Sequence, residues 1–161
     1  MNAKKAKAIV LVISGAACLA AAAAGRPELA AYPYKTVVTS GGTYANGSTV
    51  GTDFVVSGTI TSALTFSSDV PYRVTLNGAT VSAPVTLGGD ATLWLKGTST
   101  ITTSKAAALT STGTLTVGGT GSAVLQSSPT KKATGVINAV DMTVAGGALS
   151  VVLDSQIKQE D

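Results

Sequence analysis

The chain has no histidine, one cysteine and few aromatic residues, which make up 4% of its 161 residues. Without histidine, neither a Ser-His-Asp arrangement nor a histidine-based metal site can be built. The one cysteine, Cys18, lies near the N-terminus, so no disulfide can form within the rest of the chain. No helix-period segment of useful length separates the alternating segments that follow, which excludes a doubly wound α/β fold.

The N-terminus has the pattern of an export leader. Three basic residues precede the apolar run "AIVLVISGAACLAAAAA": Lys4, Lys5 and Lys7. The alanines up to Ala24 offer small-residue cleavage sites. The pattern predicts a cleaved signal helix at residues 1–24 and a secreted or cell-surface protein. A lipid on Cys18 is the less favoured alternative, because Gly15 stands where lipoprotein leaders carry leucine.

Charge is scarce, with 11 basic and 8 acidic residues in the full chain. Because three of the basic residues belong to the leader, its removal leaves eight of each sign. The remaining chain is formally neutral and has no basic stripe with interleaved aromatic residues. The sequence therefore predicts no nucleic-acid partner, and contact with a membrane only through the leader or a lipid on Cys18.

A phrase of apolar, variable, apolar, variable and glycine residues recurs along the chain. It reads "FVVSG" to Gly58, "VTLNG" to Gly78, "LWLKG" to Gly97, "LTVGG" to Gly119 and "MTVAGG" to Gly146. Strict alternation ended by a turn residue predicts one strand per phrase, and a second alternating segment follows most of them. The glycine intervals of 20, 19, 22 and 27 residues match the coil length of a parallel β-helix.

This self-similarity predicts an all-β fold, a single-stranded right-handed parallel β-helix of about five short coils. An antiparallel β-sandwich is the alternative, since frequent turn signals are typical of it too. We assign residues 25–52 to an N-terminal linker and cap, 53–154 to the β-helix repeats, and 155–161 to a polar C-terminal tail. The segment "SSPTKKATG" at 127–135 is interpreted as a loop leaving the rod.

In such a coil the two apolar positions of each phrase form inward columns. They are Phe54 and Val56, Val74 and Leu76, Leu93 and Leu95, Leu115 and Val117, and Met142 and Val144. Trp94, the only tryptophan, then points outward. Its predicted counterparts in the other coils are Val55, Thr75, Thr116 and Thr143.

The stretch from "GTYANGSTV" through "VTLNGATVSAPVTLGGDATLWLKG" resembles the β-helical repeats of secreted bacterial surface proteins of the "carbohydrate-binding domain-containing" type, within the pectate-lyase-like solenoid class. The resemblance covers most of residues 43–147. It implies a solenoid at the cell surface and a polysaccharide or cell-surface glycan as partner. The repeated phrase itself marks a coil and not a ligand.

Catalytic chemistry is not predicted, because the strands carry no paired carboxylates. Four aspartates stand shortly before the glycine-ended strands: Asp53, Asp69, Asp90 and Asp141. A carboxylate ladder for Ca²⁺ is one interpretation, and capping of each aspartate's own turn is the favoured one. We therefore expect no catalytic residue, no cofactor and no metal site.

The outward Trp94 suggests a platform on which the apolar face of a sugar ring could stack. Arg73, Thr75 and Thr116 are the residues predicted to bond the sugar hydroxyls around it. Two alternatives stay open: a protein contact, and a cover supplied by the N-terminal tyrosines, namely Tyr32, Tyr34 and Tyr44.

These observations predict a secreted cell-surface β-solenoid that acts as a carbohydrate-binding module without catalytic activity. The alternative is a structural or adhesive surface protein, acting through protein contacts or end-to-end self-association. That alternative follows from the solenoid ends, since an uncapped coil exposes unpaired backbone groups and apolar columns.

Overall fold

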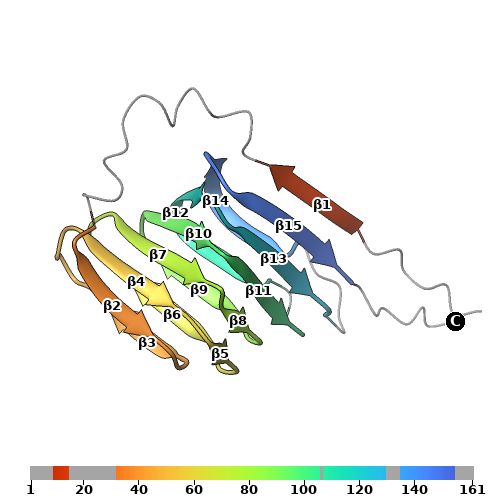
Figure 1. Ribbon diagram of the computed structural model, residues 1–161, viewed down its shortest axis with the longest axis horizontal. Helices are drawn as coiled ribbons and strands as arrows, with labels where there is room; N and C mark the ends of the chain where they lie inside the picture. The colour runs from red at the N-terminus through yellow and green to blue at the C-terminus, as the bar shows by residue number, and fades with distance from the viewer. Residues whose placement is uncertain (1–8, 15–31, 106, 130–134, 155–161) are drawn as a thin grey trace, which may run out of the picture.

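The computed structural model describes residues 9–14, 32–105, 107–129 and 135–154, and these residues form only strands and turns (Figure 1). Successive strands pair in parallel with their counterparts one turn later, which is the geometry of a β-solenoid. The prediction of an all-β parallel solenoid is confirmed, and the antiparallel sandwich is excluded. Within the described ranges there is no helix with the length and apolar character needed to cross a membrane.

Three parallel sheets form the sides of the coil. Sheet 1 contains the glycine-ended phrases: β2 (Tyr34–Val38), β4 (Thr52–Val56), β7 (Tyr72–Asn77), β10 (Ala91–Lys96) and the C-terminal parts of β12 (Leu109–Gly119) and β14 (Ile137–Val144). Sheet 2 contains β5 (Thr59–Ile60), β8 (Thr80–Val81), β11 (Thr98–Thr103), β13 (Ser122–Ser127) and β15 (Ala148–Leu153).

Sheet 3 contains β3 (Gly42–Ala45), β6 (Leu64–Ser67), β9 (Val85–Gly88) and the N-terminal parts of β12 and β14. The chain passes from sheet 1 to sheet 2 to sheet 3 and then begins the next turn. The five strands of sheet 2 mark about five turns, as the repeat count predicts. Glycines with positive φ close the corner between sheets 1 and 2 in the early turns, at Gly58, Gly78 and Gly97.

The interior columns are those that the alternation predicts. Most members are fully buried, from Phe54 and Val56 through Leu93 and Leu95 to Leu115 and Val117. Met142 and Val144 are only partly buried because no sheet 1 strand follows the last turn, where they pack against the edge of the core.

One part of the predicted register is wrong. Leu93 lies beside Val117 in the next turn, and not beside Leu115, so the phrase of β12 is displaced by two residues. The reason is the choice of glycine in "LTVGGTGSAVL". The corner equivalent to Gly97 falls at Gly121, because Thr98 pairs with Ser122 immediately after it. Gly119, the glycine used to align the phrase, instead lies beside Leu95.

The stacked strands begin earlier than the predicted boundary at residue 53. β2 and β3 lie within the segment assigned to a linker and cap, yet they pair in register with β4 and β6. Tyr44 of β3 stacks on Phe66 with 5.6 Å between ring centroids, and its hydroxyl donates to the Ser40 carbonyl. The solenoid therefore starts at Tyr34. Residues 25–31 lie outside the described residues.

The predicted leader is described only at Ile9–Ser14, which form strand β1 antiparallel to β15 (Figure 1). For these six residues the predicted signal helix is wrong. Isoleucine and valine favour strands, and the last turn offers them the open edge of sheet 2. The rest of the leader, including Cys18, lies outside the described residues. So do 130–134 of the predicted loop and the tail at 155–161.

Candidate functional site

Two columns of side chains point outward from sheet 1, because side chains alternate between the faces of a strand. One column runs through Lys35, Asp53, Arg73, Thr92, Thr116 and Thr143. The other runs through Val37, Val55, Thr75, Trp94 and Gly118. These columns contain all four residues predicted for the sugar platform.

Trp94 points outward, as predicted, and is partly exposed. Its neighbour in the next turn is Gly118, so the prediction that Thr116 shares its column is wrong by the same two residues as above. A β-carbon built on Gly118 would lie 2.9 Å from Cζ3 of the indole. The missing side chain therefore leaves the space that the ring occupies.

The opposite side of the indole faces Arg73. The guanidinium carbon lies 5.6 Å from the centroid of the Trp94 ring and 4.7 Å from that of the Tyr32 ring. Both distances are in the range of cation–π attraction. The order Tyr32, Arg73, Trp94 defines what we call the aromatic–arginine stack.

A buried carboxylate holds the arginine in place. Nη2 of Arg73 donates to Oδ2 of Asp53 at 2.8 Å, with the two side chains 3% and 2% exposed. The hydroxyl of Thr75 donates to the other oxygen, Oδ1, at 2.7 Å. Arg73 and Thr75 are therefore structural groups beneath the surface, and not the exposed hydrogen-bonding groups that the sequence predicted. The cause is the cover over this part of the sheet, to which Tyr32 and Trp94 contribute.

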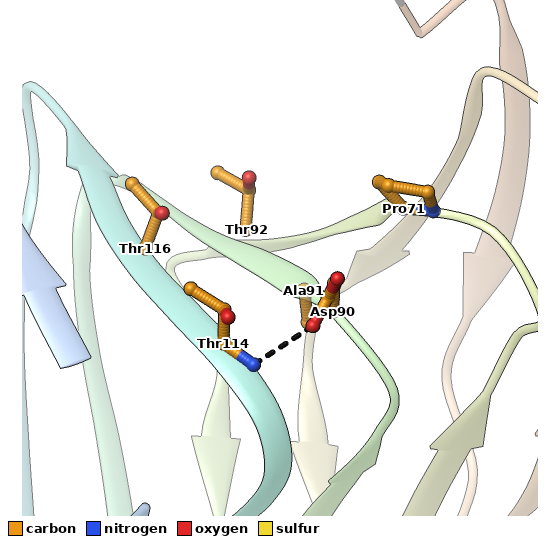
Figure 2. A pocket seen from close by; sticks show the side chains of 6 residues that line it. All are labelled: Pro71, Asp90, Ala91, Thr92, Thr114 and Thr116. Atoms are coloured by element: carbon orange, nitrogen blue, oxygen red, sulfur yellow. Dashed lines mark hydrogen bonds between the residues drawn. The ribbon is translucent and has the colours of Figure 1, made fainter. Parts of the chain in front are cut away.

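A shallow hollow opens earlier along the same strands, where β10 and β12 begin their sheet 1 segments. Its lining is Pro71, Asp90, Ala91, Thr92, Thr114 and Thr116, and we call it the threonine hollow (Figure 2). Thr92 stands one outward position before Trp94, which is about 7 Å along the strand. Thr92 and Thr116 are partly exposed, and Thr114 is exposed. Of the four predicted site residues, Thr116 lines the hollow and Trp94 lies one outward position beyond Thr92.

The sequence analysis missed Thr92, Thr114 and Asp90 as site residues. Oδ1 of Asp90 accepts a hydrogen bond from the backbone N–H of Thr114 at 2.9 Å, across the gap between two turns (Figure 2). This bond fixes the rim of the hollow. The signal available in the sequence was "GGDATLW", a turn followed by outward threonine and tryptophan.

The four aspartates do not act alike. Asp53 belongs to the buried ion pair and Asp90 bonds the following turn, so for these two the prediction of capping their own turn is wrong. Oδ2 of Asp69 accepts a bond from the hydroxyl of Ser48, 21 residues earlier, at 3.5 Å, so this bond does not cap the aspartate's own turn either. Nowhere in the described ranges do three or more His, Cys, Asp or Glu side chains gather in a metal-binding arrangement.

The N-terminal tyrosines also differ from one another. Tyr32 belongs to the aromatic–arginine stack, Tyr44 lies against the core, and Tyr34 is 61% exposed. The predicted cover of Trp94 is therefore limited to Tyr32, which reaches the indole through Arg73. Below the sheet, burial raises the pKa of the Tyr72 hydroxyl well above its ordinary value, and a bond to the Gly88 backbone opposes part of that shift.

The resulting surface combines a partly exposed indole with three threonine hydroxyls and one carboxylate that line a hollow nearby on the same strands. Such a surface can stack an apolar ring face and bond hydroxyl groups at its rim. No family model, curated protein or solved structure matches the chain.

Proposed function

We propose that this β-solenoid is an exported, non-enzymatic carbohydrate-binding module. A sugar ring lies against Trp94, and hydroxyls of that ring and of the neighbouring units of the glycan chain bond Thr92, Thr116 and Thr114, which follow one another along the hollow. The observation that carries this proposal is the partly exposed indole one outward position along β10 from Thr92, which lines the threonine hollow. The resemblance of the repeats to secreted carbohydrate-binding solenoids points in the same direction.

The geometry favours a polymer over a small molecule. Deep pockets bury most of a small ligand's surface, whereas this hollow is shallow and lies on one side of a regular sheet. A polysaccharide can cross such a surface and contact it with only one or two sugar units at a time. We therefore assign the site to a segment of a glycan chain.

The charges favour an uncharged sugar. The positive charge of Arg73 is neutralised by Asp53 beneath the surface. The hollow itself presents the exposed carboxylate of Asp90. A uronic acid or sulfate group placed there would meet a like charge, whereas a neutral ring loses nothing.

The indole is also held in place before any ligand arrives. Gly118 lies against one part of the ring and Arg73 against another, and Arg73 is itself fixed by Asp53. A side chain that is already ordered loses little conformational entropy on binding. This arrangement supports a binding role for Trp94.

The non-enzymatic part of the proposal rests on the same surface. Glycoside hydrolysis uses two carboxyl groups about 5–9.5 Å apart, and the hollow contributes one, Asp90. Export rests on the leader pattern at residues 1–24, with a lipid on Cys18 as the less favoured variant.

Affinity electrophoresis through gels that contain single polysaccharides tests the proposal. We expect a neutral polysaccharide to retard the wild-type chain, and Trp94→Ala to remove the retardation. Thr143→Val, in the same outward face but outside the hollow, is the matched control and should behave as wild type. Retardation that persists in Trp94→Ala would place the sugar elsewhere, and no retardation by any polysaccharide would refute the binding role.

A structural or adhesive role is the second candidate. It is favoured by the exposed apolar side chains of Tyr34 and Val37 on β2, the N-terminal edge strand of sheet 1. In that case the substitution Val37→Lys would reduce protein contacts and leave glycan retardation unchanged.

A further inference from the structure

The edge of sheet 2 after the last turn is occupied by a strand from the leader. β1 pairs with β15 over six residues, from Ile9 opposite Leu153 to Ser14 opposite Ala148. This is the antiparallel pairing in an otherwise parallel set of strands. The β15 edge is therefore able to accept an added antiparallel strand.

We propose that removal of the leader uncovers the β15 edge, and that a second copy of this chain then occupies it. The product is a two-fold symmetric dimer in which two β15 strands pair antiparallel. This inference rests on the export part of the proposed function, because leader cleavage uncovers the edge, and it is independent of sugar binding.

Symmetry selects this arrangement over a head-to-tail stack. A two-fold axis beside an edge strand places the second copy of that strand antiparallel to the first, which is the orientation that β1 already adopts. In a head-to-tail stack, β15 of one copy would instead pair with the first strand of sheet 2 in the next copy, and a long pairing needs a long first strand. The first strand there, β5, has two residues.

The last turn also leaves apolar surface for a partner to cover. Val151 and Leu153 of β15 are partly exposed, whereas their counterparts in the preceding turn, Leu125 and Ser127, are fully buried. In the same way Val144 is partly exposed and Val117 is fully buried. A second copy at this end would shield these side chains from water.

The backbone hydrogen bonds identify which residues face the edge. The N–H groups of Ala148 and Asp154 donate to carbonyls of the preceding turn, at Gly121 and Ser127. Because alternate residues of a strand direct their amides to opposite sides, Val151 directs its amide away from the preceding turn and toward β1. Its partner Leu11 then forms a hydrogen-bonded pair with it, and the next pair, Val12 with Val152, does not.

The core residues that the structure describes all lie between Val38 and Leu153, so residues 25–161 contain that core. A chain of residues 25–161 therefore represents the protein after leader cleavage in the following test. Sedimentation velocity over a dilution series compares it with the full chain. We expect a concentration-dependent dimer for residues 25–161 and a monomer for the full chain.

Proline substitutions, which remove a backbone donor, test the interface. In the full chain, Leu11→Pro should release β1 and yield the dimer, while the control Val12→Pro should stay monomeric. Adding Val151→Pro to residues 25–161 should abolish the dimer with the circular dichroism of a folded solenoid retained. If that variant unfolds, Leu153→Pro, whose amide also faces the edge, replaces it.

Two results would overturn the inference. One is that residues 25–161 remain monomeric at every concentration, a result that leaves the sugar-binding proposal untouched. The other is a dimer that survives both edge prolines, which would locate the contact elsewhere on the molecule.

Discussion

On β4 and β7 the outward side chains Asp53, Arg73 and Thr75 of sheet 1 are buried, whereas the outward threonines of β10 and β12 are uncharged and at least partly open to solvent. The closed half consists of Asp53, Arg73 and Thr75, which are 1%, 3% and 6% exposed. The open half consists of Thr92, Thr114 and Thr116 with the free side of Trp94. Both halves share one sheet and one continuous register.

A charged residue on the outer face of a sheet is therefore not by itself a binding group. Arg73 has the position that the sequence predicts, one turn from Trp94 and two residues along. Its partner Asp53 and the rings on either side of it turn it into a structural residue. Trp94 lies at the boundary and serves both halves.

The largest expected effect comes from opening the closed half. Asp53→Ala leaves the Arg73 charge buried without its carboxylate and removes the acceptor of the Thr75 hydroxyl. Loss of one partner of a buried ion pair costs about 3–5 kcal/mol. Urea unfolding at neutral pH measures this loss. The control Asp90→Ala, in the open half, should cost no more than about 1 kcal/mol, and equal costs for the two would contradict the comparison.

The pH dependence of stability tests whether the Tyr72 hydroxyl, in the interior beneath Asp53, Arg73 and Thr75, is shielded from water. The folded pKa of Tyr72 is raised above its unfolded value of 10.0, mainly by burial. The folded protein then retains a proton on Tyr72 that the unfolded chain releases. The contribution of Tyr72 to the free energy of unfolding is therefore constant below about pH 10 and falls as the pH rises further. Chemical unfolding from about pH 8 to about pH 11, which brackets the ordinary tyrosine pKa, measures this fall.

Tyr72→Phe should flatten that fall relative to wild type, whereas Tyr34→Phe, at an exposed ring, should not change it. A wild-type profile that stays flat to pH values well above 10 would show that Tyr72 is not closed off from water.

Gly118→Ala tests the boundary between the halves. The new methyl group would meet the far end of the indole at about 3 Å, so the ring moves and the backbone does not need to. We expect a stability loss of about 1 kcal/mol, at the low end for overpacking, with a clear change in tryptophan emission. Gly113→Ala meets backbone instead of a ring and should destabilise the fold more while leaving the emission of the folded state unchanged.

The smallest effect is expected within the open half. Thr116→Val keeps the shape and strand preference of the residue and removes one hydroxyl from the hollow. Glycan affinity should fall by a factor of about 2–10, the equivalent of one hydrogen bond, with the unfolding midpoint unchanged. Titration of a retarding polysaccharide against Thr116→Val and Thr143→Val measures it, and equal affinities for both variants would remove Thr116 from the site.

The fold was predictable because a solenoid repeats its chemistry. Apolar alternation ended by glycine gave the strands, the parallel stacking and the inward columns from Phe54 to Val117. The register of β12 was not, because "GGTG" offers several glycines for one corner and the sequence does not say which has the corner position. The same displacement by two positions explains why Thr116 was wrongly predicted to lie in the column of Trp94.

The candidate site was predictable only in part. An outward tryptophan follows from alternation alone, so Trp94 was found. The burial of Arg73 depends on Tyr32, which approaches from before the first strand, and no local pattern announces a contact between residues 41 positions apart in the chain. The strand β1 was missed because an apolar segment that follows three lysines has the sequence pattern of a signal helix, and the sequence does not reveal the sheet edge that the structure places beside it.

The proposal that a neutral glycan stacks on Trp94 is tested most directly by the fluorescence of this residue, since it is the only tryptophan in the chain. Acrylamide quenching is measured with and without each polysaccharide that retards the protein. We predict that a bound neutral glycan shields the exposed side of the indole. The quenching constant should therefore fall, and the emission should shift to shorter wavelength. A glycan that binds while the quenching and emission of Trp94 remain those of the free protein would contradict it.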